Sequence, residues 1–201
     1  AGKGLYCSVM LQPPFPPDVL SELTAWTAVA VCRALEACCG LSAGIKWTND
    51  VIVNGRKICG ILTELEFEGE TLQTSHVIIG IGINMAQTPQ DFGPELDPIA
   101  TSLLQELGRP VRKAELAVCL LRALDHMYAS FPREKARYLE EYRRRCVTLG
   151  RQVYLVRGEE RIPAFAEEVD GDFALICRME DGSRRKVTAG EVSVRGMMGY
   201  V

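Results

Sequence analysis

The Asn54-Gly55 dipeptide lies between two runs rich in apolar and β-branched residues, "DVIV" and "RKICGILTELE". Asn-Gly in a two-residue loop is the strongest short-range signal for a β-hairpin, because both central positions of the favoured turn need a positive φ. A second turn, "FEGET", leads into the apolar run "SHVIIGIGINM". Together these signals predict an antiparallel meander over residues 44–85, with the two long runs as neighbouring strands.

The segments around this meander predict an α/β fold of the α+β type. From the apolar periodicity we expect a strand over residues 4–12, a helix over 19–39 and a long helix over 113–146. After residue 150, short β-like segments alternate with Gly and Asp turns, which favours a small SH3-like β barrel. We therefore expect a mixed sheet with flanking helices in a first domain, residues 1–148, and the barrel in a second, residues 149–201.

The formal net charge of −3 at pH 7 provides no general field that would draw nucleic acid or an anionic membrane surface to the chain. An anionic ligand must therefore be held by cations placed locally. The eight cysteines include no C-x-x-C pair, which indicates a reducing compartment, and no apolar stretch is long enough for a membrane span. His76 and His126 have no Cys or carboxylate at metal-ligand spacing, so we expect no zinc site. We interpret the protein as cytoplasmic.

Two glycines share one face of the strand "HVIIGIGIN". Because side chains alternate across a strand, one face carries Val77, Ile79, Ile81 and Ile83, and the other carries Ile78, Gly80, Gly82 and Asn84. Glycine weakens a strand, so two of them on one face suggest close approach by a ligand or by another backbone. A β-bulge, or a helix packed on the glycines, is the alternative interpretation.

The predicted hairpin also brings charged and polar residues together. Lys46, Asn49 and Asp50 precede the Asn54-Gly55 turn and Lys57 follows it, so the hairpin can fold the two cations back toward each other. An exposed hairpin with solvated lysines is the ordinary alternative. The Asn-Asp pair favours a site, because polar groups between a tryptophan and the apolar "VIV" are costly without partners.

The string "IKWTNDVIVNGRKICGILTE", followed by "VIIGIGINM" and then "ATSL", resembles the catalytic domain of biotin protein ligases. The family pattern is Lys-Trp-Pro-Asn-Asp, a Lys shortly before Gly-Ile-Leu-x-Glu, and Gly-x-Gly-Ile-Asn. The tail "GEVSVRGMMGYV" is similar to the end of the small C-terminal β domain in bacterial members. The resemblance implies ATP-dependent attachment of biotin to a lysine of a biotin carboxyl carrier domain, through a biotinyl-5'-AMP intermediate.

The resemblance also implies a role for each site residue. Lys57 is the expected catalytic residue, which contacts the biotin carboxylate and the reacting phosphate. Biotin is expected to lie against Lys57, Gly60, Gly80 and Gly82, and the nucleotide against Lys46, Asn49, Asp50 and Asn84. Asp50 either orients Lys57 or helps to place Mg²⁺, which is expected to arrive with ATP and not in a metal site of the protein.

Two departures from the family pattern matter. Thr48 stands where the motif has proline, and it leaves every polar group of the motif in place. Family members also carry a Ser-Thr biotin-contact motif and a flexible Gly-Arg-Gly-Arg-Arg-Gly loop ahead of a segment equivalent to "GKGLYCSVML". Neither precedes that segment in the 201 residues, so we expect these residues by themselves to lack half of the biotin pocket and to transfer biotin poorly.

Two other functions stay open at this point. One is that of an N-terminally truncated, non-catalytic remnant that binds only nucleotide or the carrier protein. The other is lipoate attachment on a similar fold, which the Lys-Trp-x-Asn-Asp and C-terminal signals weaken. Nucleic-acid binding is not supported by this chain, and a homodimer is compatible with it.

Overall fold

The structure is a computed structural model that describes residues 2–68, 73–188, 193–196 and 200. Its helices are α1 (Pro17–Leu20), α2 (Leu23–Cys39), α3 (Pro89–Leu96), α4 (Leu103–Leu107), α5 (Lys113–Ser130) and α6 (Lys135–Arg145). Its strands are β1 (Gly4–Leu11), β2 (Gly44–Lys46), β3 (Asp50–Val53), β4 (Arg56–Glu68), β5 (Gln73–Asn84), β6 (Gln152–Arg157), β7 (Glu160–Val169), β8 (Leu175–Met179), β9 (Arg184–Val187) and β10 (Ser193–Gly196). Helices beside two separate sheets confirm the predicted α+β class.

The first sheet has the strand order β1-β5-β4-β3-β2 and contains the predicted meander. Asn54 and Gly55 have φ values of 49° and 79°, as the two-residue turn requires. The expected mixed sheet is instead antiparallel in all of its described ladders. The reason is that turns join β2, β3 and β4, while β5 pairs antiparallel with both β4 and β1. The second predicted turn, residues 67–71, lies partly outside the described residues. Parallel pairing in the described ranges is confined to two isolated bridges, Ile45 with Cys146 and Lys57 with Ala100.

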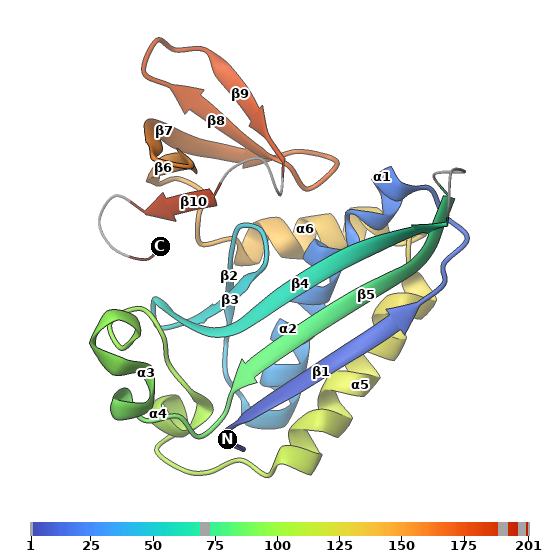
Figure 1. The fold of residues 1–201 in the computed structure, drawn as a ribbon, viewed down its shortest axis with the longest axis vertical. Coiled ribbons are helices and arrows are strands. Elements are labelled where there is room, and N and C mark those ends of the chain that lie inside the picture. Colours follow the sequence, from blue (N-terminus) through green and yellow to red (C-terminus); the bar gives the residue numbers. More distant parts are fainter. Residues whose placement is uncertain (1, 69–72, 189–192, 197–199, 201) are drawn as a thin grey trace.

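Helices α2 and α5 cover one face of the first sheet, and the opposite face carries no helix over β1, β4 and β5 (Figure 1). The covered face holds the alternating residues Val77, Ile79, Ile81 and Ile83 of β5, each at most 3% exposed. Burial of an aliphatic side chain of this size stabilises the fold by about 1.5–3 kcal/mol. The alternation predicted for β5 is therefore confirmed, and its glycine face points away from the helices.

The helices differ from the predicted ones at two breaks. The expected helix over 19–39 is divided into α1 and α2 by a turn at Ser21 and Glu22, and it ends at Gly40, whose φ is 69°. The expected helix over 113–146 stops at Ser130 and resumes at Lys135. Pro132 explains the second break, because proline lacks the N–H that a helix interior needs. No helix in the described ranges combines the length and the apolar character needed to cross a membrane.

The second sheet has the order β10-β6-β7-β8-β9, and its ladders are antiparallel. It begins directly after Gly150, where the sequence composition changes. The described ladders join the five strands in a row, so closure into an SH3-like barrel stays a prediction. The division into domains at residues 148 and 149 also stays a prediction.

Candidate functional site

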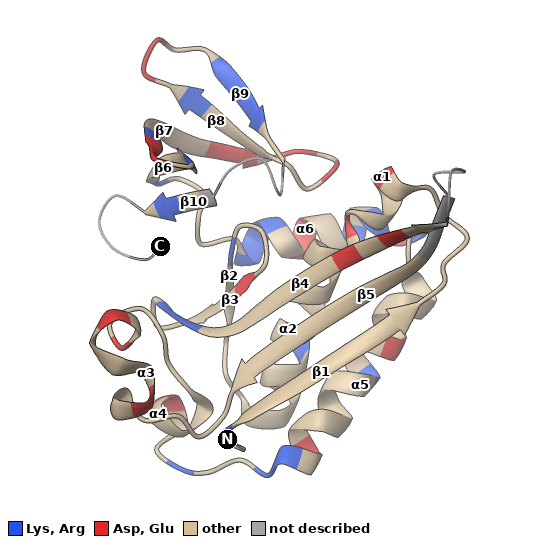
Figure 2. Cartoon of the chain, viewed as in Figure 1, with Lys and Arg blue, Asp and Glu red and all other residues tan. Residues whose placement is uncertain are grey.

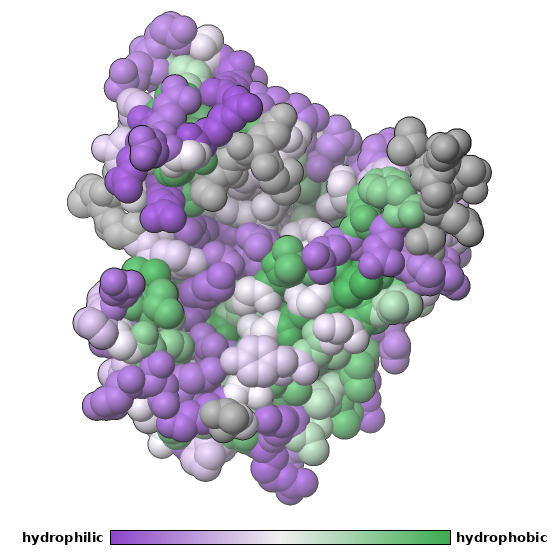
Figure 3. Space-filling view, viewed as in Figure 1, coloured by the Kyte–Doolittle hydropathy of each residue, from purple (hydrophilic) through white to green (hydrophobic). Residues whose placement is uncertain are grey.

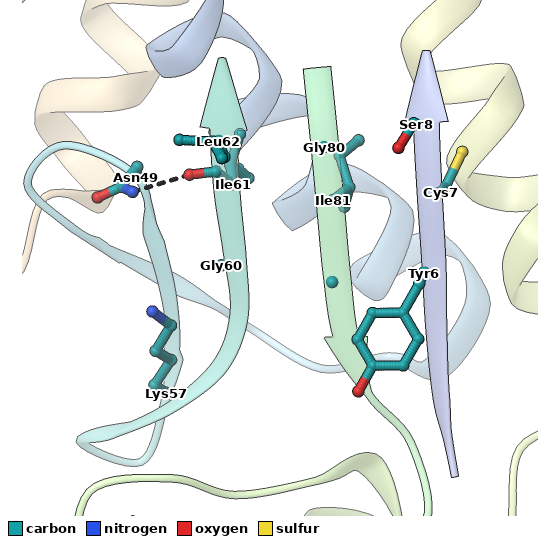
Figure 4. Close-up of a pocket in the computed structure, with 11 residues that line it drawn as sticks. Tyr6, Cys7, Ser8, Asn49, Lys57, Gly60, Ile61, Leu62, Gly80 and Ile81 are labelled. Atoms are coloured by element: carbon teal, nitrogen blue, oxygen red, sulfur yellow. Dashed lines mark hydrogen bonds between the residues drawn. The ribbon is translucent and has the colours of Figure 1, made fainter. Parts of the chain in front are cut away.

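A pocket of about 510 Å³ lies on the open face of the first sheet, across β1, β5 and β4 (Figure 4). Its lining residues are Tyr6, Cys7, Ser8, Asn49, Lys57, Gly60, Ile61, Leu62, Gly80, Ile81 and Gly82. Five of the residues expected from the sequence thus share one pocket: Asn49, Lys57, Gly60, Gly80 and Gly82. Three others, Lys46, Asp50 and Asn84, are not among the lining residues.

The glycines form a floor that other side chains approach closely. Gly60 of β4 lies opposite Gly82 of β5, and Gly82 lies opposite Tyr6 of β1. A Cβ at Gly60 would stand 3.1 Å from Cε and Nζ of Lys57, and a Cβ at Gly82 would stand 3.3 Å from the ring of Tyr6. At Gly80 the nearest atom would be at 3.7 Å, an ordinary contact. Gly60 and Gly82 therefore make room for neighbouring side chains, whereas a Cβ at Gly80 would fit without displacing a neighbour.

Lys57 and Asp50 form an ion pair at the edge of this floor. Lys57 follows the Asn54-Gly55 turn on β4, Asp50 begins β3, and their Nζ and Oδ1 atoms are 2.5 Å apart. The Lys57 side chain is 37% exposed, whereas that of Asp50 is 14% exposed. In Figure 4 the Lys57 amine extends beside Gly60 and toward Asn49. The pair confirms that the hairpin places the cation next to the Asn-Asp segment.

Lys46 is buried behind this pair, with an exposed fraction of 7%. It is opposite Asp50 in the β2–β3 ladder, so Asp50 lies between the two lysines. Burial lowers the pKa of the Lys46 ammonium to about 8; the attraction of Asp50 opposes this shift, and the charges of Lys57 and Arg195 add to it. The ring of Tyr200 lies over its Nζ, 3.7 Å from the ring centroid. Lys46 is therefore a desolvated cation whose charge depends on its neighbours.

The two asparagines hold the backbone around the pocket. The side-chain nitrogen of Asn49 donates to the carbonyl of Ile61 at 2.8 Å, which ties the motif to β4. Asn84, at the end of β5, donates to the carbonyl of Thr101 at 3.0 Å and accepts from Gln87 at 3.1 Å. Both polar side chains thus have partners, and the expected contacts of Asn49 and Asn84 with a nucleotide stay predictions.

The charged side chains on this face belong to β4, with Lys57 near its start and the exposed Glu64 and Glu66 farther along. Strands β1 and β5 carry no Lys, Arg, Asp or Glu in their described residues, as Figure 2 shows. Apolar and small side chains dominate the surface there (Figure 3). The exposed fractions are 73% for Tyr6 and 62% for Met10 of β1, and 61% for Leu62 of the neighbouring β4. An anionic group in the pocket would therefore meet Lys57, with apolar surface beside it.

Tyr6, Ser8 and Tyr200 are residues that the sequence reasoning missed. Tyr6 and Ser8 could have been found from the alternation of β1, which puts them on one face, but only its pairing with β5 places that face over the glycines. Nothing in the sequence pattern connects Tyr200 with residues 46–50.

Metal ligands are scarce near the site. The described residues include no group of three or more His, Cys, Asp or Glu side chains arranged to hold a metal ion. Asp50 was expected to orient Lys57 or to help place Mg²⁺, and its two oxygens contact Lys57 and Tyr200. Both contacts are compatible with the orienting role, which stays a prediction, and a carboxylate engaged on both oxygens fits poorly as a direct ligand of Mg²⁺.

The fold is that of a known class of proteins. The family model of the Biotin/lipoate A/B protein ligase family matches residues 1–84, which include β1 to β5 and every residue that lines the pocket. The biotin–[acetyl-CoA-carboxylase] ligase of Paracoccus denitrificans is 32% identical to the chain in an alignment 203 positions long, which covers 94% of this chain and 79% of that protein. The chain belongs to the biotin protein ligase family, as its motifs indicate.

Two further relatives show the extent of the match. The bifunctional ligase/repressor BirA of Bacillus subtilis (strain 168) is 40% identical over 130 residues, 65% of this chain and 39% of that protein. The biotin protein ligase from Aquifex aeolicus in complex with biotin and ATP matches the fold with a TM-score of 0.80 at 26% identity, over 96% of this chain and 79% of that chain. The chain thus spans less than half of the length of the Bacillus subtilis relative and most of the Aquifex aeolicus chain.

Proposed function

We propose that the protein attaches biotin to a lysine of a biotin carboxyl carrier domain in two steps. ATP and the biotin carboxylate first form biotinyl-5'-AMP with loss of pyrophosphate, and the carrier lysine then takes the biotinyl group with release of AMP. The observation that carries the proposal is the Lys57 ammonium held by Asp50 beside the glycine floor of an otherwise uncharged pocket.

The first step brings together two anions, the biotin carboxylate and the α-phosphate of ATP. At a separation of ~4 Å and an effective dielectric constant near 20, their repulsion is about 4 kcal/mol. A fixed ammonium offsets this repulsion and stabilises the charge that develops during attack on phosphorus. Lys57 suits this role because its amine is partly exposed to the pocket while Asp50 restrains it.

The remaining site residues divide between the two substrates. Gly60, Gly80 and Gly82 allow biotin to lie against the backbone of β4 and β5, next to the apolar surface of β1. Lys46, Asn49, Asp50 and Asn84 are assigned to the nucleotide side, where Asp50 acts by orienting Lys57. Mg²⁺ arrives with ATP, bound by its phosphates and by water, both of which are usual ligands of Mg²⁺ in sites that bind nucleotides.

The comparisons support this choice of substrates. One matching structure is described as a complex of biotin protein ligase with biotin and ATP, and two relatives are named as ligases that act on biotin or on acetyl-CoA carboxylase. The matching family model also includes lipoate ligases, so lipoate is the competing substrate. No feature of the pocket favours lipoate over biotin.

The test is pyrophosphate exchange into ATP by the complete protein, measured with biotin, with lipoate and without either acid. We expect exchange that depends on biotin, followed by transfer of labelled biotin to a carrier domain. Exchange with lipoate alone would replace biotin by lipoate in the proposal. Binding of ATP without exchange would favour a non-catalytic binding protein.

A further inference from the structure

Tyr200 is distant from the candidate site in sequence but contacts two of its charged residues. Its hydroxyl donates a hydrogen bond to Oδ2 of Asp50, and its ring lies over Nζ of Lys46 at 3.7 Å from the centroid. These contacts connect the C-terminal part of the chain, beyond β10, with β2 and β3 of the first sheet. The Tyr200 side chain thus contacts both Asp50, the ion-pair partner of Lys57, and Lys46.

The carboxylate of Asp50 is held from two sides. Its Oδ1 atom is buried without an aligned hydrogen bond and relies on the Lys57 ammonium 2.5 Å away, while Oδ2 accepts from Tyr200. A rotation of the carboxylate would break one of these contacts. Without the tyrosine hydroxyl, Asp50 would be free to turn toward Lys46, its neighbour in the β2–β3 ladder. The position of the Lys57 ammonium therefore depends on the hydroxyl of Tyr200.

The ring of Tyr200 has a separate effect on Lys46. Lys46 is 7% exposed, so its ammonium has lost most of its water, and Lys57 of β4 and Arg195 of β10 repel it. Asp50 of β3 attracts it. The negative face of an aromatic ring compensates a desolvated cation, and the effect is larger where water is excluded. The ring therefore stabilises the Lys46 ammonium and restrains its position.

We propose that Tyr200 is a positioning residue of this site, whose hydroxyl fixes Asp50 and through it Lys57, and whose ring fixes Lys46. The proposal rests on the proposed function, in which Lys57 serves the chemical step and Lys46 serves nucleotide binding. The two parts of one side chain then have separable effects: the hydroxyl acts on kcat, and the ring acts on KM for ATP.

Two substitutions separate these effects in the complete protein. Tyr200→Phe keeps the ring and removes the hydroxyl, so kcat for biotin-dependent pyrophosphate exchange should fall about tenfold, the size expected for one charge-assisted hydrogen bond, with KM for ATP unchanged. Tyr200→Leu removes both, so KM for ATP should also rise several-fold. Tyr128→Phe is the matched control, because Tyr128 is exposed on α5, and it should behave as the wild type.

A wild-type kcat in Tyr200→Phe would overturn the hydroxyl's role. Faster exchange in Tyr200→Leu than in the wild type would overturn the proposal as a whole, because it would show that the ring obstructs the site. A merely structural role of Tyr200 would not separate the two variants in this way, with KM for ATP unchanged in Tyr200→Phe and raised in Tyr200→Leu.

A second measurement does not depend on the proposed activity. Lys46 should react slowly with an amine-acylating reagent in the wild type and in Tyr200→Phe, and several-fold faster in Tyr200→Leu, as read by mass spectrometry of the peptide that contains it. Equal rates in all three proteins would overturn the placement of the ring. If the wild type shows no biotin-dependent exchange but the labelling follows this order, the proposed function fails and the contact of Tyr200 with Lys46 stands.

Discussion

The Lys57 ammonium lies between the Asp50 carboxylate and Gly60, which has no side chain. This arrangement places a positive charge at the edge of the pocket, within reach of an anionic ligand. In the complete protein, Lys57→Ala should lower biotin-dependent pyrophosphate exchange at least a hundredfold, on the scale of losing one group that stabilises the transition state. The free energy of unfolding should fall by only about 1–3 kcal/mol, the cost of leaving Oδ1 of Asp50 buried without a partner. Exchange kinetics and urea unfolding measure the two effects.

The matched control for this variant is Lys186→Ala, which removes a lysine paired with Asp170 at 2.7 Å in the second sheet and should leave exchange unchanged. Lys57→Arg should also be poor, because a forked guanidinium does not replace a compact ammonium between Asp50 and Gly60. A folded Lys57→Ala protein with wild-type exchange would remove Lys57 from the proposed mechanism.

The titration of Lys46, also at the residue scale, predicts that KM for ATP depends on pH. Its pKa in the folded protein is lowered to about 8, so its ammonium loses its proton as the pH rises through this value. If Lys46 serves the nucleotide, KM for ATP should rise above a pH of about 8, by up to tenfold per unit. The sign for stability is opposite: the unfolded chain keeps the proton to higher pH, so the Lys46 contribution to folding stability increases between the two pKa values.

Lys46→Arg tests this assignment, because arginine keeps its charge throughout the range. The pH profile of KM for ATP should lose its break near pH 8 in this variant, while thermal unfolding reports whether the larger head group is accommodated. An unchanged break in a folded Lys46→Arg protein would assign it to another group.

At the scale of elements, the Asn54-Gly55 hairpin is the part of the fold that the sequence determines most directly. Turn chemistry and strand alternation are local, so the meander and the buried face of β5 could be predicted from a few consecutive residues. The antiparallel addition of β1 to β5 and the break between α5 and α6 could not, although Pro132 was a usable signal for the break. Pairing between distant segments depends on tertiary packing, and the pattern of apolar residues within one segment does not reveal its pairing partner.

Gly55→Ala tests the role of this turn in fixing the site. Its φ of 79° is unfavourable for alanine although no atom lies within 4 Å of the added Cβ, so the free energy of unfolding should fall by about 1–2 kcal/mol from backbone strain alone. Gly171→Ala is the matched control, because its Cβ also meets open space and its φ is not in the left-handed region. Chemical denaturation of both proteins measures the difference, and equal stabilities would show that the turn adapts without cost.

At the scale of the whole molecule, the segment from Lys46 to Asp50 is also a contact between the two sheets. Beside the contacts of Tyr200, the Trp47 indole nitrogen donates to the carbonyl of Phe173, which lies between β7 and β8, at 2.9 Å. Tyr142 of α6 supports this contact, because its ring packs edge-on against Phe173 and its hydroxyl donates to the carbonyl of Thr48 at 3.0 Å. The sequence places Lys46, Asn49 and Asp50 together by motif. It gives no sign that Lys46, Trp47, Thr48 and Asp50 contact residues from the last third of the chain, because such contacts depend on tertiary packing.

Trp47→Phe tests whether the second sheet supports the site through this segment. The substitution keeps an aromatic ring but leaves the Phe173 carbonyl without its donor, so stability should fall by the cost of a buried unpaired acceptor, about 1–3 kcal/mol, beyond the loss of packing. Trp26→Phe is the matched control, because the Trp26 indole nitrogen is buried without a hydrogen-bond partner and only packing is lost. Thermal unfolding should show the larger loss for Trp47→Phe, and KM for ATP should rise only in that variant, since residues 46–50 hold the nucleotide side of the proposed site. Equal losses of stability with unchanged kinetics would show that the first sheet positions its site without the second.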